Sequence, residues 1–146
     1  MIYWPHILAI LVGAGLTVQI GMNATVSRVI GSSLLAAVAN FCIGLVALGI
    51  VALASGARPA PGTIGTVPAW AWLGGLFGAA YVAAITVLGP RLGAVLLLAL
   101  LLLGQMAAAL TVDYFGVVGF PQSAVTPSRM LGAALLVAGV VLIVRH

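Results

Sequence analysis

Two carboxamide side chains, Gln19 and Asn23, interrupt the otherwise apolar stretch of residues 7–26. Their spacing of four residues places both side chains on one face of a helix. A carboxamide that faces hydrocarbon is costly, so this face is expected to meet protein, water or a solute. Three further polar side chains, Asn40, Tyr81 and Gln105, lie inside other apolar stretches. The chemistry that these residues offer is neutral hydrogen bonding.

The sequence contains no constellation typical of an enzyme. Asp113 is the only carboxylate side chain, so paired acid and base catalysis has no candidates. Neither His6 nor His146 has Cys, Asp or Glu at metal-ligand spacing. The Ser and Thr residues lack a nearby His and Asp set, and no glycine-rich phosphate loop is present. We therefore expect a non-enzymatic protein without a metal or cofactor.

Composition places the chain in the membrane class. Of 146 residues, 64% are hydrophobic and only 4% are charged, and the mean hydropathy is +1.36. Soluble globular domains carry about 25% charged residues. The five Arg residues are spread over loop ends, so the net charge of +4 forms no basic patch for nucleic acid.

Hydropathy and turn residues predict a single all-α membrane domain, residues 1–146, because about 20 apolar residues span a bilayer. The predicted spans are residues 5–26, 33–54, 69–88, 92–112 and 129–144. Gly89, Pro90 and Arg91 are predicted to form the turn between the third and fourth spans. Small residues inside spans, among them Gly13, Gly21, Gly74, Gly75 and Gly78, predict close helix packing.

An odd number of spans puts the two termini on opposite sides of the membrane. Side A, that of the N-terminus, then holds Arg58 and Arg129, and side B holds Arg28, Arg91 and Arg145. Because Lys and Arg counts set orientation, this near balance predicts insertion both ways and an antiparallel homodimer. The interfacial aromatic residues support this prediction, since an antiparallel pair would anchor both leaflets. They all fall on side A: Tyr3, Trp4, Trp70, Trp72, Tyr114 and Phe115.

The predicted spans allow the depths of the amide side chains in the bilayer to be compared. At a rise of 1.5 Å per residue, Gln19 and Asn40 lie roughly 5 Å from the bilayer centre toward side B, and Gln105 lies at a similar offset toward side A. Tyr81 falls near the level of Gln19. Inverting a second copy would bring its Gln105 to the level of Gln19 and Asn40.

Each polar residue also has a structural interpretation. The amides can hold helices together instead of lining a pathway. Asp113 can pair with Arg58 or Arg129 at the end of the fourth helix or accept hydrogen bonds from nearby backbone N–H groups. The alternative is that it binds a proton or cation.

An ordered series of features along the chain resembles the YdcZ family of small inner-membrane proteins. It starts with Gln19 and Asn23 and includes Asn40-Phe41 with Gly44, Pro68 with Trp70 and Trp72, Gly104-Gln105, Asp113-Tyr114-Phe115-Gly116, and Arg129 with Gly132. The resemblance implies the drug/metabolite transporter superfamily, a bacterial inner-membrane location and export of an unspecified solute. Larger members of that superfamily have ten helices in two inverted halves, so this chain corresponds to one half.

These observations favour a secondary carrier of a small metabolite or drug-like solute, working as an antiparallel homodimer. Hydrogen bonds would come from Gln19, Asn23, Asn40 and Gln105, and an apolar wall from Trp72 or Tyr81. Asp113 is the only side chain that could couple transport to protons through a carboxylate. Two alternatives stay open at this point, a passive channel lined by amides and an accessory subunit without transport activity of its own.

Overall fold

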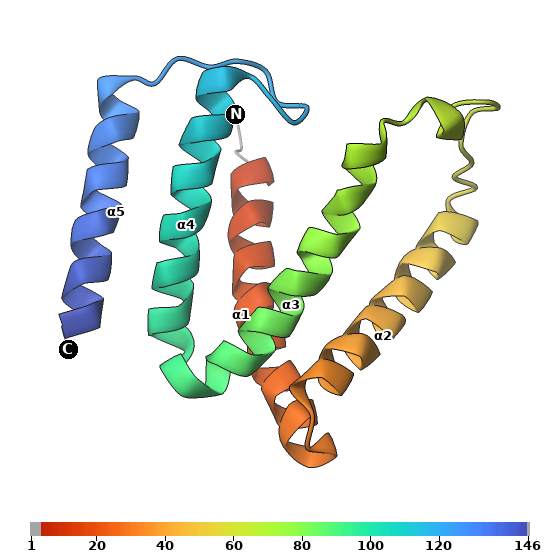
Figure 1. Cartoon of the computed structure of the whole chain (residues 1–146), viewed down its shortest axis with the longest axis horizontal. Coiled ribbons are helices and arrows are strands. Elements are labelled where there is room, and N and C mark those ends of the chain that lie inside the picture. The colour runs from red at the N-terminus through yellow and green to blue at the C-terminus, as the bar shows by residue number, and fades with distance from the viewer. Residues whose placement is uncertain (1–3, 146) are drawn as a thin grey trace. The chain divides into compact units, whose positions relative to one another are not determined.

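The structure is a computed structural model that describes residues 4–145, so Tyr3 and His146 lie outside the described part. The described chain consists of helices and loops, with no strand. Each of its five long helices is apolar enough to cross a membrane (Figure 1). These helices are α1 (Trp4–Ile30), α2 (Ser33–Ala54), α3 (Leu73–Leu92), α4 (Ala94–Phe115) and α5 (Pro127–Arg145). The predicted all-α membrane fold with five spans is confirmed.

Helices α1 and α3 extend beyond their predicted ends. Helix α1 continues to Ile30, four residues beyond the predicted end, and carries Arg28 in its last turn. Helix α3 continues through Pro90 to Leu92, so the prediction of a turn at residues 89–91 is wrong. Pro90 is tolerated there because only the final turn of the helix contains it, which confines the lost backbone hydrogen bond to the helix end. The chain reverses instead at Gly93, whose φ of 76° suits glycine.

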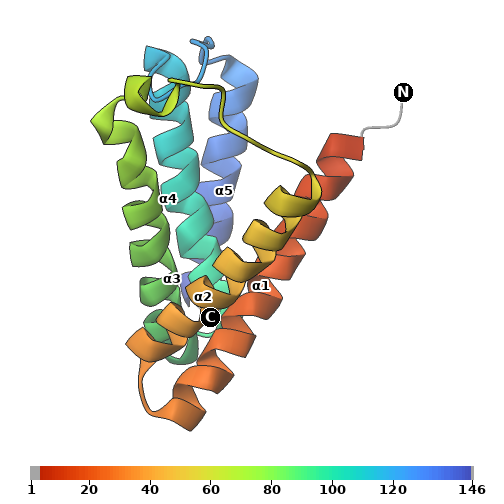
Figure 2. The same ribbon diagram turned by 90° about the vertical axis from the view of Figure 1, so that its right-hand side faces the viewer.

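The chain divides into two compact units, one up to Arg91 and one from Leu92 onward. In unit 1, α1 and α2 form an antiparallel hairpin and lie side by side in Figure 2. The turn uses Gly31, with a φ of 79°, and Ser32 caps α2 by accepting a hydrogen bond from the backbone N–H of Leu35 at 3.2 Å. Next to the turn, the hydroxyls of Ser27 in α1 and Ser33 in α2 lie 2.8 Å apart and form a hydrogen bond between the two helices.

Helix α3 completes unit 1. It follows a short 3-10 helix, η2 (Ala69–Trp72), that leads directly into it. The aromatic ring of Phe41 in α2 reaches α3 at Gly78, where its Cζ lies 4.0 Å from the position that a Cβ would occupy. The most buried apolar side chains of this unit come from all three helices, as expected for a small helical core. They are Ile20, Ala36, Ala37, Val82 and Ile85.

In unit 2, α4 and α5 form a second antiparallel hairpin (Figure 1). The connecting segment, residues 116–126, is an ordered loop. Leu97, Ala99 and Val140 are the buried apolar side chains of this unit.

Most large apolar side chains on the helices are exposed, among them Leu53 at 85% and Phe77 at 76%. Such a surface is suited to lipid chains or to another membrane protein. Among the five glycines that were predicted to allow close helix packing, only Gly78 faces a neighbouring helix at contact distance in the described structure. At Gly13, Gly21, Gly74 and Gly75 an added Cβ would meet nothing within 4 Å. Close packing at these positions therefore stays a prediction that requires a partner helix.

Candidate functional site

The side chains of Gln19 and Asn40 meet between α1 and α2. The Nε2 of Gln19 donates a hydrogen bond to the Oδ1 of Asn40 at 3.1 Å, and both side chains are half-buried. The helical hairpin brings them together because α1 and α2 run antiparallel from the turn at Gly31 and pack side by side. The bond satisfies part of the hydrogen-bonding capacity of each amide in an apolar span.

This amide pair lines a groove of about 460 Å³ in unit 1. Its walls are otherwise apolar and come mainly from α2, with one side chain of α3. Phe41, Gly44, Leu48 and Val82 are representative wall residues. None of the residues that line the groove is charged. The arrangement can hold a small solute by hydrogen bonds at one place and by apolar contact elsewhere.

Asn23 lies one turn beyond Gln19 but does not line this groove. Its side chain is only 5% exposed, and its Nδ2 has no hydrogen-bond partner among the described residues. A buried donor without an acceptor costs about 1–3 kcal/mol, so the Asn23 side chain destabilises the protomer as the structure describes it.

The two aromatic candidates lie apart from the groove lining. Tyr81 is partly exposed, and its neighbour Val82 occupies the wall position. Trp72 is 63% exposed and sits at the start of α3, nine residues before Tyr81. At 1.5 Å per residue that separation is roughly 13 Å along the helix. Sequence reasoning missed Phe41 and Val82 as wall residues. The adjacency of Phe41 to Asn40 was a usable signal for the first, whereas Val82 carried none.

Gln105 belongs to unit 2, where its side chain is exposed. Helix α4 starts two residues later and ends three residues later than predicted, because the turn lies at Gly93 and residues 113–115 remain helical. Gln105 therefore lies at the middle of α4, and its depth in the bilayer stays a prediction.

Asp113 pairs with Arg129 across the α4–α5 hairpin. The Nη1 of Arg129 lies 3.3 Å from the Oδ2 of Asp113, and the two side chains are 45% and 34% exposed. The same Nη1 donates to the Oγ of Ser123 at 2.9 Å and to the carbonyl of Ala124 at 3.4 Å. One of the two predicted partners of Asp113 is thus found, and the guanidinium also holds the connecting loop.

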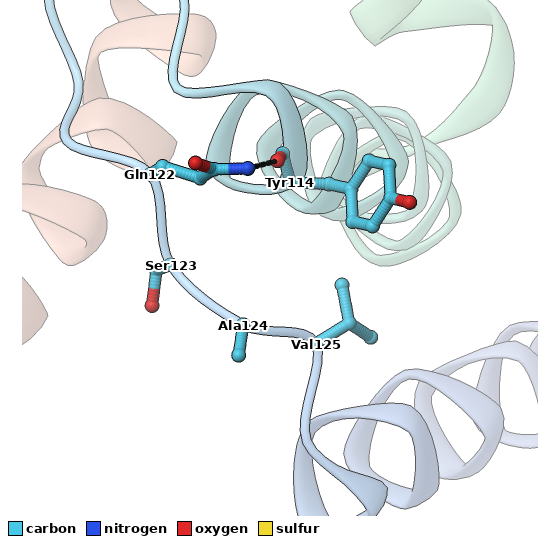
Figure 3. A pocket seen from close by; sticks show the side chains of 5 residues that line it. All are labelled: Tyr114, Gln122, Ser123, Ala124 and Val125. Atoms are coloured by element: carbon cyan, nitrogen blue, oxygen red, sulfur yellow. Dashed lines mark hydrogen bonds between the residues drawn. The ribbon is translucent and has the colours of Figure 1, made fainter.

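The loop packs back on the end of α4 (Figure 3). The Nε2 of Gln122 donates to the carbonyl of Tyr114 at 3.0 Å and thereby caps the helix. A cavity of about 530 Å³ opens here between Tyr114 and the loop residues Gln122 to Val125. In Figure 3 the side chains of Ser123 and Ala124 point away from the Tyr114 ring. We attribute this cavity to the folding of the loop and not to a ligand site, because the hydrogen bond beside it joins Gln122 to Tyr114 within the protein.

Five helices that are each apolar enough to cross a membrane, with a pair of neutral amides between two of them, indicate an integral membrane protein. Residues 4–142 match the family described as "Putative inner membrane exporter, YdcZ", and the chain belongs to that family. This confirms the resemblance noted in the sequence and the inner-membrane location. Neither a curated protein nor a solved structure shows significant similarity to the chain.

Proposed function

We propose that this protein is a secondary carrier that exports a small solute as an antiparallel homodimer. The observation that carries the proposal is the amide pair of Gln19 and Asn40 in an otherwise apolar groove within the membrane-spanning region. Membership of an exporter family supports the same function. A polar pair retained in an apolar span is expensive unless it serves packing or a ligand, and the groove beside it provides the space for a ligand.

The homodimer is supported by surfaces that unit 1 and unit 2 leave open. Gln105 exposes a carboxamide at the middle of a span, where hydrocarbon would be a poor neighbour. Gly13 and Gly74 leave room for a closely packed helix. An inverted arrangement of the partner is supported by the Arg balance, two on side A and three on side B.

In this proposal Gln19 and Asn40 bind the solute, and the exposed Gln105 supplies hydrogen bonds where the two protomers meet. Tyr81, beside the groove wall, and Trp72, directly before the start of α3, contact the solute as it enters. Alternating access proceeds by rocking one protomer against its inverted partner, so the two end states are equivalent. Asp113 stabilises the α4–α5 loop.

Counterflow in proteoliposomes tests the carrier. Vesicles are loaded with an unlabelled solute, and uptake of its labelled form is followed for uracil, which is neutral, succinate, which is anionic, and tetraphenylphosphonium, which is cationic. Saturable counterflow of at least one solute is expected, and Gln19→Ala should abolish it without loss of the dimer. A steady conductance without counterflow would instead indicate a channel. Gln122→Ala, which removes the same functional group in the loop, is the matched control.

Orientation is tested separately with reporters fused to the C-terminus. Antiparallel insertion predicts that one half of the molecules present this end on each side of the membrane. If every C-terminus were found in one compartment, the antiparallel dimer would be wrong, whatever the flux assay showed.

A further inference from the structure

The free hydrogen-bonding groups of the amide pair define what the groove can recognise. Each carboxamide has two N–H donors and one oxygen acceptor. The hydrogen bond between the two side chains uses one N–H of Gln19 and one lone pair of the Asn40 oxygen. Within residues 4–145, the Gln19 oxygen and the Asn40 amino group make no further hydrogen bond, so the pair still offers both an acceptor and a donor. Exchanging N and O in both amides would reverse these roles and leave the same pairing capacity.

The remainder of the groove determines the charge that it accepts. Its lining consists of these two amides and seven apolar residues, glycine included. A charged solute would lose its hydration there and find no opposite charge. Asp113 is the only carboxylate side chain in the sequence, and it is bonded to Arg129 in the other unit. The groove therefore offers neither a counter-charge for a cation nor one for an anion.

We infer that the groove binds an uncharged solute with an N–H donor adjacent to a carbonyl acceptor, carried on an apolar body. Carboxamides, lactams and ureas belong to this class. Such an edge satisfies the free acceptor of Gln19 and the free donor of Asn40 together, and the apolar body packs against Phe41, Leu48 and Val82. The inference rests on the proposed function, because it names the substrate class of the same groove.

Ligands that share one shape and differ in charge provide the test. Benzamide is neutral, benzoate is its anionic counterpart, and benzamidinium is its cationic counterpart. Acetophenone keeps the carbonyl but lacks the N–H donor. Binding to the purified full-length protein is read from the rise in unfolding temperature with ligand concentration. We expect benzamide to bind at least about tenfold more tightly than either ion, and acetophenone to bind several-fold more weakly than benzamide.

Two variants assign this binding to the amide pair. The double variant Gln19→Leu with Asn40→Leu replaces both amides by apolar side chains and removes every polar side-chain atom of the groove lining, so benzamide selectivity should be lost. Gln19→Met serves the same purpose if the double variant does not fold. Gln122→Leu, in the loop of unit 2, should bind benzamide like the unmodified protein. The inference is overturned if either ion binds as tightly as benzamide, or if the double variant retains the selectivity.

Failure of the carrier and failure of the ligand class give different results. Benzamide binding without counterflow of any solute contradicts the carrier and leaves the ligand class standing. Counterflow of succinate or tetraphenylphosphonium, with none of uracil and no benzamide binding, contradicts the ligand class and leaves the carrier standing.

Discussion

Gln19 in α1 and Asn40 in α2 are joined side chain to side chain, 3.1 Å from Nε2 to Oδ1, although 21 positions separate them in the sequence. The bond links α1 and α2, the two arms of a helical hairpin, and each of these helices is a candidate membrane span. Interhelical hydrogen bonds in membranes are worth only about 0.6 kcal/mol on average, so this bond alone does not explain why two costly amides are kept there. The groove beside them offers the other reason.

The amide pair predicts a non-additive response to mutation. Gln19→Leu should lower the free energy of unfolding by about 1 kcal/mol, because it leaves the Asn40 amide without its partner. The double variant with Asn40→Leu should be close to the unmodified protein, since both polar groups are then gone. Unfolding in detergent with increasing denaturant measures the two variants and Asn40→Leu alone, as a double-mutant cycle. Simple additivity of the two single losses would show that the two amides are not coupled.

Asn23 should respond in the opposite direction to Gln19. Its buried Nδ2 lacks an acceptor within the described residues, and leucine has a similar volume without the unsatisfied donor. Asn23→Leu is therefore expected to raise the free energy of unfolding of the protomer by about 1–2 kcal/mol. The measurement is thermal unfolding of the monomer in detergent. A loss of stability would mean that the Asn23 oxygen makes a needed contact, and Asn23→Asp would then be tested as a partial replacement.

The spans were predictable because bilayer thickness demands about 20 apolar residues, and that requirement is visible in any single segment. The Asp113–Arg129 pair was one of two predicted alternatives, since only one carboxylate is available to five Arg residues. The bond between Gln19 and Asn40 was not predictable in the same way. It depends on how two helices rotate against each other, which is set by their packing. The turn predicted at residues 89–91 was wrong because the prediction treated Pro90 as a helix breaker. Proline breaks helix interiors more severely than helix ends, and Pro90 lies in the last turn of α3.

A charge placed in the groove should change its preference. Gln19→Glu puts a carboxylate beside Asn40 in a lining that otherwise has no charge. Benzamidinium then gains a counter-charge, whereas benzoate meets repulsion. We expect benzamidinium to become the tightest of the three ligands in the thermal-shift assay. If benzamide still bound most tightly to Gln19→Glu, the side chain at position 19 would not face the ligand.

We expect Asp113 to stabilise the protein through its ion pair with Arg129 and to take no part in transport. The pair is substantially exposed, so Asp113→Asn should cost no more than about 1 kcal/mol and leave uracil counterflow unchanged. Arg129→Gln should be more damaging, because its Nη1 also holds Ser123 and the Ala124 carbonyl. Hydrogen exchange of residues 116–126 should increase more in Arg129→Gln than in Asp113→Asn. Loss of pH-driven accumulation in Asp113→Asn would instead identify this carboxylate as the coupling group.

The end of α4 depends on Gly116 for two separate reasons. Its φ of 62° is left-handed, which costs other residues about 1–2 kcal/mol. In addition, a Cβ at this position would lie 2.8 Å from the Cβ of Gln122 and 3.0 Å from its Cα. Because the second clash involves backbone, Gly116→Ala must displace the segment that caps α4.

Gly31 is the matched control for this substitution. It has a similar φ of 79°, but an added Cβ would meet nothing within 4 Å. Gly31→Ala should therefore lower the free energy of unfolding only by the backbone contribution of about 1–2 kcal/mol. Gly116→Ala should lower it by more and should show faster proteolysis in residues 116–126. Thermal unfolding and limited proteolysis measure the two variants together. Equal losses in both variants would show that the loop moves away from Gly116 without cost and that the contact between Gly116 and Gln122 does not hold it in place.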